Sequence, residues 1–224
     1  MNLQDKNSEN AIVKNIKESV KNHLPFILFV ILLFSFRSSV ADWYYVPSGS
    51  MEPTIKVGDR VVVDKSAYTL ELPFTNVVIA QTGDIKRGDI VIIDSTAANT
   101  RLIKRVIAVE GDKVELENNV LFINGEKAAL SPSGSQVYSE EILGHSRTIA
   151  LNPIPSPAKS FNVVTVPKAH LLAMGDNRNN SVDSRYYGFI PVEEVQGKAT
   201  SVAFSLDTHN MYLPRKDRVF TTLQ

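Results

Sequence analysis

The sequence predicts an all-β, mostly antiparallel fold behind a single N-terminal membrane anchor. Beyond residue 50, short runs rich in Val, Ile, Thr and Tyr are separated by Gly, Pro and Asn turns, a pattern typical of strands. Before them, near the N-terminus, lies one long apolar stretch without charge. No internal repeat or heptad pattern competes with this interpretation.

The composition narrows the class of protein. The chain has 224 residues, enough for one or two domains with a core, and its 24 Lys and Arg balance its 24 Asp and Glu. Without a basic surplus, nucleic acid is not an expected partner. The absence of cysteine excludes disulfides, thiolate metal sites and cysteine nucleophiles.

The anchor is expected over residues 24–45, after a polar tail over residues 1–23. The uncharged run Leu24–Phe36 would reach only about 20 Å as a helix, short of a hydrocarbon core of about 30 Å. Extension to Tyr45 supplies the length, with Arg37 snorkelling toward a headgroup. The aromatic residues Trp43–Tyr45 would then form an interfacial belt.

The tail sets the expected orientation of the anchor. Lys14, Lys17 and Lys21 precede the span, which favours a cytoplasmic N-terminus and a body on the outer face. Two alternatives remain open: a buried core helix, and a cleaved signal peptide ending at the small-residue site "SSVA" before Asp42.

The body divides into three parts at the level of sequence. Residues 46–110 and 163–224 carry clear strand runs and are expected to form one catalytic β-core. Residues 111–162 are expected to be a β-rich, loop-heavy insertion. Within it, Asn124-Gly125 favours a tight hairpin turn, and the Ser- and Pro-rich stretch 131–162 is expected to be irregular.

The sequence gives little support for a histidine as a metal ligand or as a catalytic base. The four histidines show no HExxH or HxH spacing, so no zinc site is expected; they are His23, His145, His170 and His209. A Ser-His-Asp triad assembles in space rather than in sequence, so His170 stays open as a general base.

A lysine offers a different base. In "RLIKRVIAV", strand alternation predicts Lys104 as the only polar residue on a face with Leu102, Val106 and Ala108. Burial among aliphatic side chains disfavours the charged amine, and a shift of its pKa from ~10.4 to near 8 needs roughly 3 kcal/mol. A neutral amine can take a proton from a serine hydroxyl. The alternative is a snorkelling surface lysine.

Four segments together resemble the bacterial type I signal peptidase family, the Ser-Lys endopeptidases also called leader peptidases. They are "PSGSMEPT", "RGDIVII", "LIKRVIAVEGDKV" and "GDNRNNSVDSRYYGFIP", in the family's order and directly after an anchor. The resemblance covers Arg37 to about Phe204. It departs at "AVEGD" (Ala108–Asp112), where family members often carry Gly-Leu-Pro-Gly-Asp.

The resemblance implies the following roles. Ser50 is the nucleophile, Lys104 its general base, and the Ser48 hydroxyl with the Ser50 N–H forms the oxyanion hole. Residues of the last segment support them: Ser181 hydrogen-bonds the lysine, Asp183 and Arg185 form an ion pair, and Gly175 and Asp176 begin the segment. The implied fold is two antiparallel β-sheet domains.

The implied activity is removal of N-terminal signal peptides from exported preproteins, after small residues at −3 and −1, through an acyl-enzyme. No metal or cofactor is required. The implied location is the bacterial inner (cytoplasmic) membrane, as a single-pass, monomeric protein with its catalytic domain on the periplasmic face. The expected partners are the lipid bilayer and membrane-embedded preproteins. Rival interpretations are a self-cleaving Ser-Lys repressor, a peptidase dedicated to one substrate, and a membrane-tethered β-module without catalysis.

Overall fold

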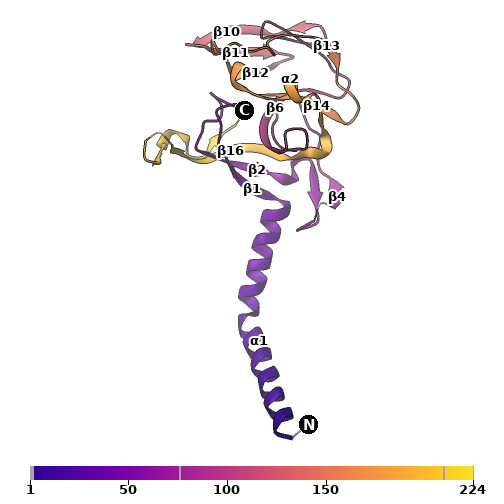
Figure 1. Ribbon diagram of the computed structural model, residues 1–224, viewed down its shortest axis with the longest axis vertical. Helices are drawn as coiled ribbons and strands as arrows, with labels where there is room; N and C mark the ends of the chain where they lie inside the picture. Colours follow the sequence, from indigo (N-terminus) through magenta and orange to yellow (C-terminus); the bar gives the residue numbers. More distant parts are fainter. Residues whose placement is uncertain (1–2, 76, 209, 224) are drawn as a thin grey trace.

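The structure, a computed structural model, describes residues 3–75, 77–208 and 210–223. His209 and the side chains of Lys14 and Lys17 lie outside the described part. The chain is mostly β with one long N-terminal helix, as the sequence predicts. In Figure 1 this helix projects from the β body, with β1, β2 and β16 beside it and β10–β13 at the opposite end.

The largest sheet follows the order β1-β2-β16-β5-β6-β14-β15, and every pairing in it is antiparallel. In the described residues two short strands also pair with β16. The strands are β1 (Ala41–Tyr45), β2 (Asp59–Asp64), β5 (Ile90–Ser95), β6 (Thr100–Val109), β14 (His170–Met174), β15 (Ile190–Pro191), β16 (Val195–Asp207), β17 (Leu213–Pro214) and β18 (Thr221–Thr222).

Three smaller antiparallel sheets complete the described body. A hairpin is made of β3 (Thr69–Glu71) and β4 (Val78–Gln81). A second sheet contains β10 (Ala129–Gly134), β11 (Val137–Ile142) and β12 (His145–Ala150). A third contains β13 (Phe161–Thr165), β7 (Lys113–Glu117), β8 (Val120–Ile123) and β9 (Glu126–Lys127).

The hairpin signal at Asn124-Gly125 is confirmed. Both residues have positive φ, 53° and 84°, and they join β8 to β9. The expectation of irregular structure over residues 131–162 is wrong for its first two thirds, where β10–β12 form a regular sheet. Its polar, Ser-rich strands face solvent on one side, so they lack the apolar runs from which the other strands were recognised.

The anchor helix differs from its expected bounds. The helix α1 (Leu3–Ser39) ends six residues before Tyr45, and the aromatic residues Trp43–Tyr45 lie in β1, paired with β2. The expected boundary at residue 45 is therefore wrong: aromatic residues favour a strand, and β2 supplies its partner. The apolar window Glu18–Ser39 has 22 residues and mean hydropathy 1.7, which at 1.5 Å per residue gives about 33 Å.

The described part of the helix is not covered by the body, which contradicts the core-helix alternative. Two contacts hold the C-terminal end of α1 against the body. The Lys65 ammonium donates to the Ser38 carbonyl oxygen at 2.5 Å, and Arg37 pairs with Asp42 at 2.9 Å. The small-residue site before Asp42 thus ends at Ala41, which is paired with Asp64 in the sheet. These attachments favour a retained anchor.

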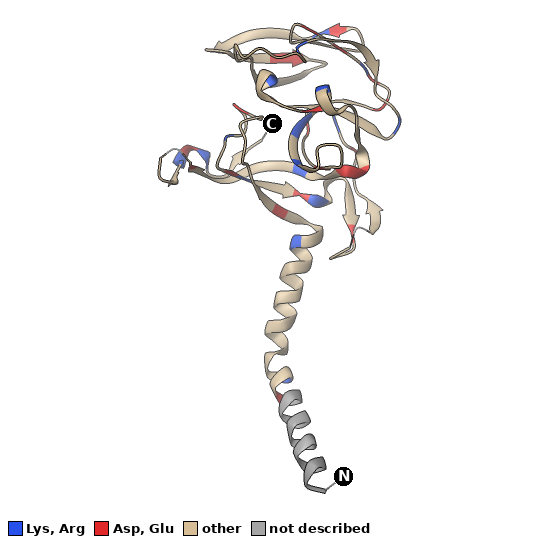
Figure 2. Cartoon of the chain, viewed as in Figure 1, with Lys and Arg blue, Asp and Glu red and all other residues tan. Residues whose placement is uncertain are grey.

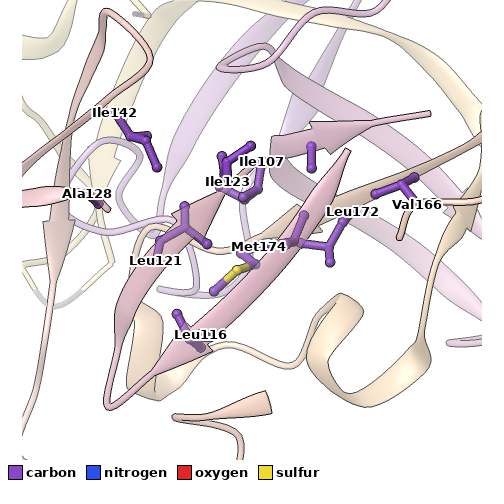
Figure 3. Packing of buried hydrophobic residues seen from close by; sticks show 11 residues of the cluster. Ile107, Leu116, Leu121, Ile123, Ala128, Ile142, Val166, Leu172 and Met174 are labelled. Atoms are coloured by element: carbon purple, nitrogen blue, oxygen red, sulfur yellow. The ribbon is translucent and has the colours of Figure 1, made fainter. Parts of the chain in front are cut away.

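Side chains of β5 alternate between the two faces of the largest sheet. Ile90 and Ile92 pack in a cluster with Met51 and Ile55, from the turn that carries Ser50. Val91 and Ile93 pack on the other face. A third cluster joins the largest sheet to the β7–β8 sheet (Figure 3); its labelled members are Ile107, Leu116, Leu121, Ile123, Ala128, Ile142, Val166, Leu172 and Met174.

A buried ion cluster attaches the β10–β12 sheet to the segment after β14. Glu140 of β11 accepts from Arg178 through both carboxylate oxygens, at 2.8 and 2.5 Å, and from Nε of Arg147 at 2.6 Å. All three side chains are buried. Burial alone would raise the pKa of Glu140, but the two guanidinium groups outweigh it and lower the pKa to about 2.

We predict that Glu140→Gln lowers the free energy of unfolding by about 3–5 kcal/mol, because it leaves two buried guanidinium groups without a counter-ion. The neighbouring Glu141→Gln, an exposed change in the same strand, should have little effect. The stabilisation by Glu140 is present above its ordinary pKa of 4.5 and is lost as the pH falls toward 2. Thermal unfolding of both variants in detergent checks this; equal midpoints would contradict it.

Candidate active site

The turn that carries Ser50 is fixed by core packing on its C-terminal side. Met51 and Ile55 are fully buried, and the Ile55 N–H donates to the Met51 carbonyl oxygen at 2.9 Å. Val46, at the other end, donates its N–H to Asp59 of β2 at 3.0 Å. Ser50 itself is 8% exposed, so the hydroxyl lies in a fixed place at the edge of the core.

Lys104 of β6 meets this hydroxyl. Its Nζ donates to the Ser50 Oγ at 2.8 Å, and the lysine is 3% exposed. Burial lowers the pKa of Lys104 from 10.5 to about 8; Asp183 opposes this shift, Arg185 adds to it, and Asp176 opposes it. A substantial fraction of the amine is therefore neutral near pH 8, and a neutral amine can accept the proton of the hydroxyl that it contacts.

The structure contains part of the aliphatic strand face that was predicted around Lys104. Leu102 and Val106 pack in the same cluster as Val91, the cross-strand partner of Lys104. Ala108 packs elsewhere, because the register of β6 against β14 shifts after Val106. The predicted alternation therefore places aliphatic side chains beside Lys104 at two of the three expected positions, Leu102 and Val106.

Asp183 organises the region behind the lysine. Its carboxylate accepts from Arg185 Nε and Nη2, both at 2.8 Å, from the Ser181 hydroxyl at 2.7 Å and from the Gly175 N–H at 2.9 Å. Burial would raise the pKa of this carboxyl, but Arg185 and these hydrogen bonds lower it. The expected Asp183–Arg185 pair is present. The Ser181 hydroxyl donates to Asp183, and among the described residues no hydrogen bond joins Ser181 to Lys104.

Gly175 lies where no side chain can fit. A Cβ on this residue would stand 2.3 Å from the Ser181 Oγ and 2.4 Å from the Ser50 carbonyl oxygen. The backbone of the last segment therefore approaches the Ser50 turn directly, and glycine is needed for that approach.

Asp176 has a larger role than the start of a segment. It accepts from Arg105 Nε and Nη2, both at 2.8 Å, and from the Thr54 hydroxyl at 2.6 Å. It therefore ties β6 to the turn after Ser50. Arg105 was overlooked in the sequence, although it stands between Ile103 and Ile107 on the opposite strand face and the argument applied to Lys104 applies to it equally.

Asn177 fastens the Ser50 turn itself. Its backbone N–H donates to the Ser50 carbonyl oxygen at 3.0 Å, and its side-chain amide donates to the Gly49 carbonyl oxygen at 3.0 Å. The amide of Asn152 donates to the Asn177 Oδ1 at 2.7 Å. No sequence signal distinguished Asn177 within "GDNRNN", since a surface Asn turn has the same composition.

Two hydrogen-bond donors of the Ser50 turn are the Ser48 hydroxyl and the Ser50 N–H. Ser48 is exposed, and within the described residues neither its hydroxyl nor the Ser50 N–H has a hydrogen-bond partner. Both are thus available to an incoming oxygen atom.

The histidines lie elsewhere. His170 in β14 has its Nδ1 against the Lys168 carbonyl oxygen at 2.8 Å, and His145 lies near Gly88. Among the described side chains, no group of three potential metal ligands occurs. The basic side chain that hydrogen-bonds to the Ser50 hydroxyl is that of Lys104, so the triad alternative with His170 has no support.

Comparison with known proteins decides the family. The model of the signal peptidase family, peptidase S26, matches residues 17–204. The chain belongs to this family. Similar relatives include signal peptidase I of Pseudomonas fluorescens, 33% identical over 89% of this chain and 76% of the relative. Signal peptidase I of Pseudomonas aeruginosa is 32% identical over 97% and 81%, and signal peptidase I P of Bacillus subtilis subsp. natto is 32% identical over 87% and 94%.

Family membership supports a peptidase that removes signal peptides, and the exposed N-terminal apolar helix indicates a membrane-anchored protein. The match covers every segment on which the resemblance was based, and it ends at Phe204, before β17 and β18.

We predict that Gly175→Ala abolishes measurable processing, at least a 100-fold loss, because the new Cβ displaces the Ser50 turn or Ser181. Gly134→Ala is the matched control: its Cβ would meet only Val137, at an ordinary 3.7 Å, in an exposed strand. Cleavage of a preprotein in detergent measures both. Normal activity of Gly175→Ala would show that the close approach is unimportant.

We also predict that Lys104→Met stabilises the fold at pH 7 while removing activity. Below its folded pKa of about 8 Lys104 is charged in both states, and the folded state carries the cost of burying the charge. At 1.36 kcal/mol per pKa unit this cost is roughly 3 kcal/mol, and it disappears as the pH rises from 8 toward 10.5. The unfolding midpoint of Lys104→Met should therefore exceed that of the wild type at pH 7, and the two midpoints should converge at pH 10; a variant less stable than the wild type at pH 7 would refute this.

Proposed function

We propose that the protein is a membrane-anchored serine endopeptidase that removes signal peptides, with Ser50 as nucleophile and Lys104 as general base. The observation that carries the proposal is the 2.8 Å contact between the Lys104 Nζ and the Ser50 Oγ in a buried environment. Burial lowers the pKa of the amine to about 8, so that a larger fraction is neutral and able to accept the proton of the hydroxyl.

The reaction proceeds through an acyl-enzyme. The Ser50 Oγ attacks the carbonyl carbon of the scissile bond while its proton passes to Lys104. The Ser48 hydroxyl and the Ser50 N–H donate to the oxyanion that forms. Lys104 then returns the proton to the leaving amine, which releases the mature protein. A water molecule, deprotonated by Lys104, attacks the acyl group and regenerates Ser50.

The edge of β6 offers a binding site for an extended substrate. β5 pairs with residues 100–105 of β6, whereas β14 pairs only with residues 105–109. In the described part of the sheet the opposite edge of residues 100–104 is thus open, and it leads to Lys104. A substrate strand added there would be held by backbone hydrogen bonds.

Strand geometry also explains a requirement at −3 and −1. Alternate side chains of an extended strand point to the same face, so the −1 and −3 side chains face the enzyme together and −2 faces away. Two shallow sites on one face would reject large side chains at both positions.

The membrane arrangement follows from the helix. The lysines before the span favour a cytoplasmic N-terminus and a catalytic body on the periplasmic face of the bacterial inner membrane. From Ser39 to Ser50 is eleven residues, so even an extended chain keeps Ser50 within about 40 Å of the helix end. A preprotein whose apolar segment is still in the bilayer can reach it.

The rival interpretations predict other behaviour. A dedicated peptidase keeps the same chemistry but rejects most preproteins. A tethered binding module has no need of a buried lysine in contact with a serine. A self-cleaving repressor needs a DNA-binding domain, whereas residues Leu3–Ser39 form one continuous helix rather than a helix-turn-helix.

We predict that Ser50→Ala and Lys104→Ala each abolish cleavage of a preprotein with an Ala-x-Ala site while the protein stays folded. Lys104→Arg should also be inactive, since a guanidinium remains protonated. Ser48→Ala should lose activity less completely, and the exposed Lys113→Ala should retain it. The rate of the wild type should rise through pH 8. Robust cleavage by Lys104→Ala would refute the proposed base.

A further inference from the structure

A cavity between the largest sheet and the β10–β12 sheet carries positive charge that the proposed catalysis does not use. It lies between the turn before β5, the start of β12 and the first half of β16, and its volume is about 370 Å³. We call it the cationic cavity, after its cationic lining residues Lys86, Arg87, Arg105, Arg147 and Lys198. Asp89 is the one carboxylate among the described residues that line it, and neither Ser50 nor Lys104 is among them.

Ion pairs neutralise only part of this charge. Three of the five cations each have a carboxylate of their own, in the pairs Arg87–Asp112, Arg105–Asp176 and Lys198–Asp89. Arg147 shares Glu140 with Arg178, and the exposed Lys86 has no ion pair in the described part of the chain. With Arg178 included, six cationic side chains face four carboxylates, which leaves two positive charges in excess.

Arg147 carries the buried part of this excess. The residue is 6% exposed, and its Nε donates to the Glu140 carboxylate at 2.6 Å. Its Nη2 lies in ion-pair contact with the same carboxylate, but among the described residues neither Nη atom makes a hydrogen bond. A buried guanidinium with unused donors is costly, because it has lost water without gaining acceptors. An oxyanion in the cavity would supply the missing acceptors.

The charges around Arg147 lead to the same conclusion. Burial lowers the pKa of Arg147, Glu140 opposes this shift, and Arg178 and Arg105 add to it. Glu140 is already engaged through both oxygens by Nη1 and Nη2 of Arg178, at 2.8 and 2.5 Å. A single carboxylate therefore serves two guanidinium groups, and the surroundings of Arg147 are short of negative charge.

We propose that the cationic cavity binds the phosphate group of a soluble phosphate monoester. Lys86, Arg147 and Lys198 line the cavity from three different elements, namely the turn before β5, β12 and β16. A tetrahedral phosphate presents acceptors in several directions, whereas the two oxygens of a carboxylate are satisfied by one guanidinium fork. Near neutral pH a monoester carries close to two negative charges, which matches the excess of two positive charges.

The rest of the cavity fits a small organic molecule. Ile90, Ala199 and Leu223 add apolar surface to the lining, and the volume lies within the range of about 300–1,000 Å³ that is usual for small-molecule sites. The charge excess is local, since the chain has no net charge and Figure 2 shows Lys and Arg dispersed over the β body among Asp and Glu. A compact anion therefore fits better than an extended polyanion.

Calorimetric titration of the full chain with inorganic phosphate tests the proposal. The protein is kept in maltoside micelles, which contain no phosphate, and sodium chloride holds the ionic strength constant so that general screening does not change. Saturable one-to-one binding in the millimolar range or below is expected. Acetate should bind at least about tenfold more weakly, because its planar carboxylate cannot meet cations on three sides. Absence of saturable phosphate binding, or acetate binding as tight as that of phosphate, would overturn the proposal.

Arg147→Met should raise the dissociation constant for phosphate at least about tenfold, since charge-assisted hydrogen bonds are lost. The variant is expected to fold, because Glu140 keeps both hydrogen bonds to Arg178 and the two charges then balance. The matched control is Arg101→Met, at an exposed arginine outside the cavity lining, which should stay within about twofold of the wild type. Equal weakening in both variants would overturn the proposal.

A second variant does not touch the buried cluster. Lys86→Ala changes an exposed residue of the lining and should raise the dissociation constant about threefold. The control Lys159→Ala removes the same charge from an exposed position outside the lining and should leave the constant unchanged. An unchanged constant in Lys86→Ala, or the same loss in Lys159→Ala, would show that phosphate is attracted by the surface in general and would contradict the proposed site.

The type of ester distinguishes a soluble ligand from a lipid headgroup. Glycerol phosphate is a monoester, whereas glycerophosphoglycerol is a diester with one charge, like the headgroup of phosphatidylglycerol. The monoester should bind several-fold more tightly; tighter binding of the diester would assign the cavity to a lipid and overturn the proposal. Ser50→Ala should bind phosphate with the affinity of the wild type, since Ser50 does not line the cavity. The binding measurement is therefore independent of the proposed catalytic pair.

Discussion

The proposed chemistry depends on one constraint: the amine of Lys104 must be buried enough to lose its charge and still reach the Ser50 hydroxyl. Water would hold the amine protonated, and a protonated amine cannot serve as a base. The contact of 2.8 Å in a site with 3% exposure of the lysine meets both requirements. The cost is a charge buried at neutral pH, which the rest of the fold has to tolerate.

The segment from Gly175 to Arg185 makes this possible. Gly175 allows its backbone to touch the Ser50 turn, Asn177 hydrogen-bonds that turn, and Asp176 ties it to β6 through Arg105. Asp183 lies behind the lysine with Arg185 as its counter-ion, so that the two charges largely offset each other near Lys104. The Glu140 cluster fixes the same segment from the β10–β12 sheet. Ser50 and Lys104 come from parts of the chain 54 residues apart, and this third segment holds them in contact.

Much of this could be predicted from sequence, and the failures have physical reasons. The strands with alternating apolar residues were recognised, because burial of one strand face gives the hydrophobic pattern a period of two residues. Lys104 interrupts that pattern and was recognised for this reason. The β10–β12 strands were not, because their exposed Ser and Pro residues resemble loops. The anchor boundary was misplaced at Tyr45, since aromatic residues serve equally at a membrane interface and in a strand, and only pairing with β2 distinguishes them. Local patterns do not reveal the roles of Arg105, Asn177 and Glu140, because their partners are distant in sequence. Ser181 was expected to hydrogen-bond to the lysine, whereas its hydroxyl donates to Asp183.

The most direct measurement is the ionisation of Lys104 itself. The chain can be labelled with lysine carrying ¹³C at Cε, and Lys104→Met identifies the signal of residue 104 by its disappearance. The expected result is a pKa of about 8 for this amine in the folded protein, well below the value of about 10.4 for a lysine in a model peptide. A pKa of Lys104 near 10.4 would contradict the claim that burial prepares it to act as a base.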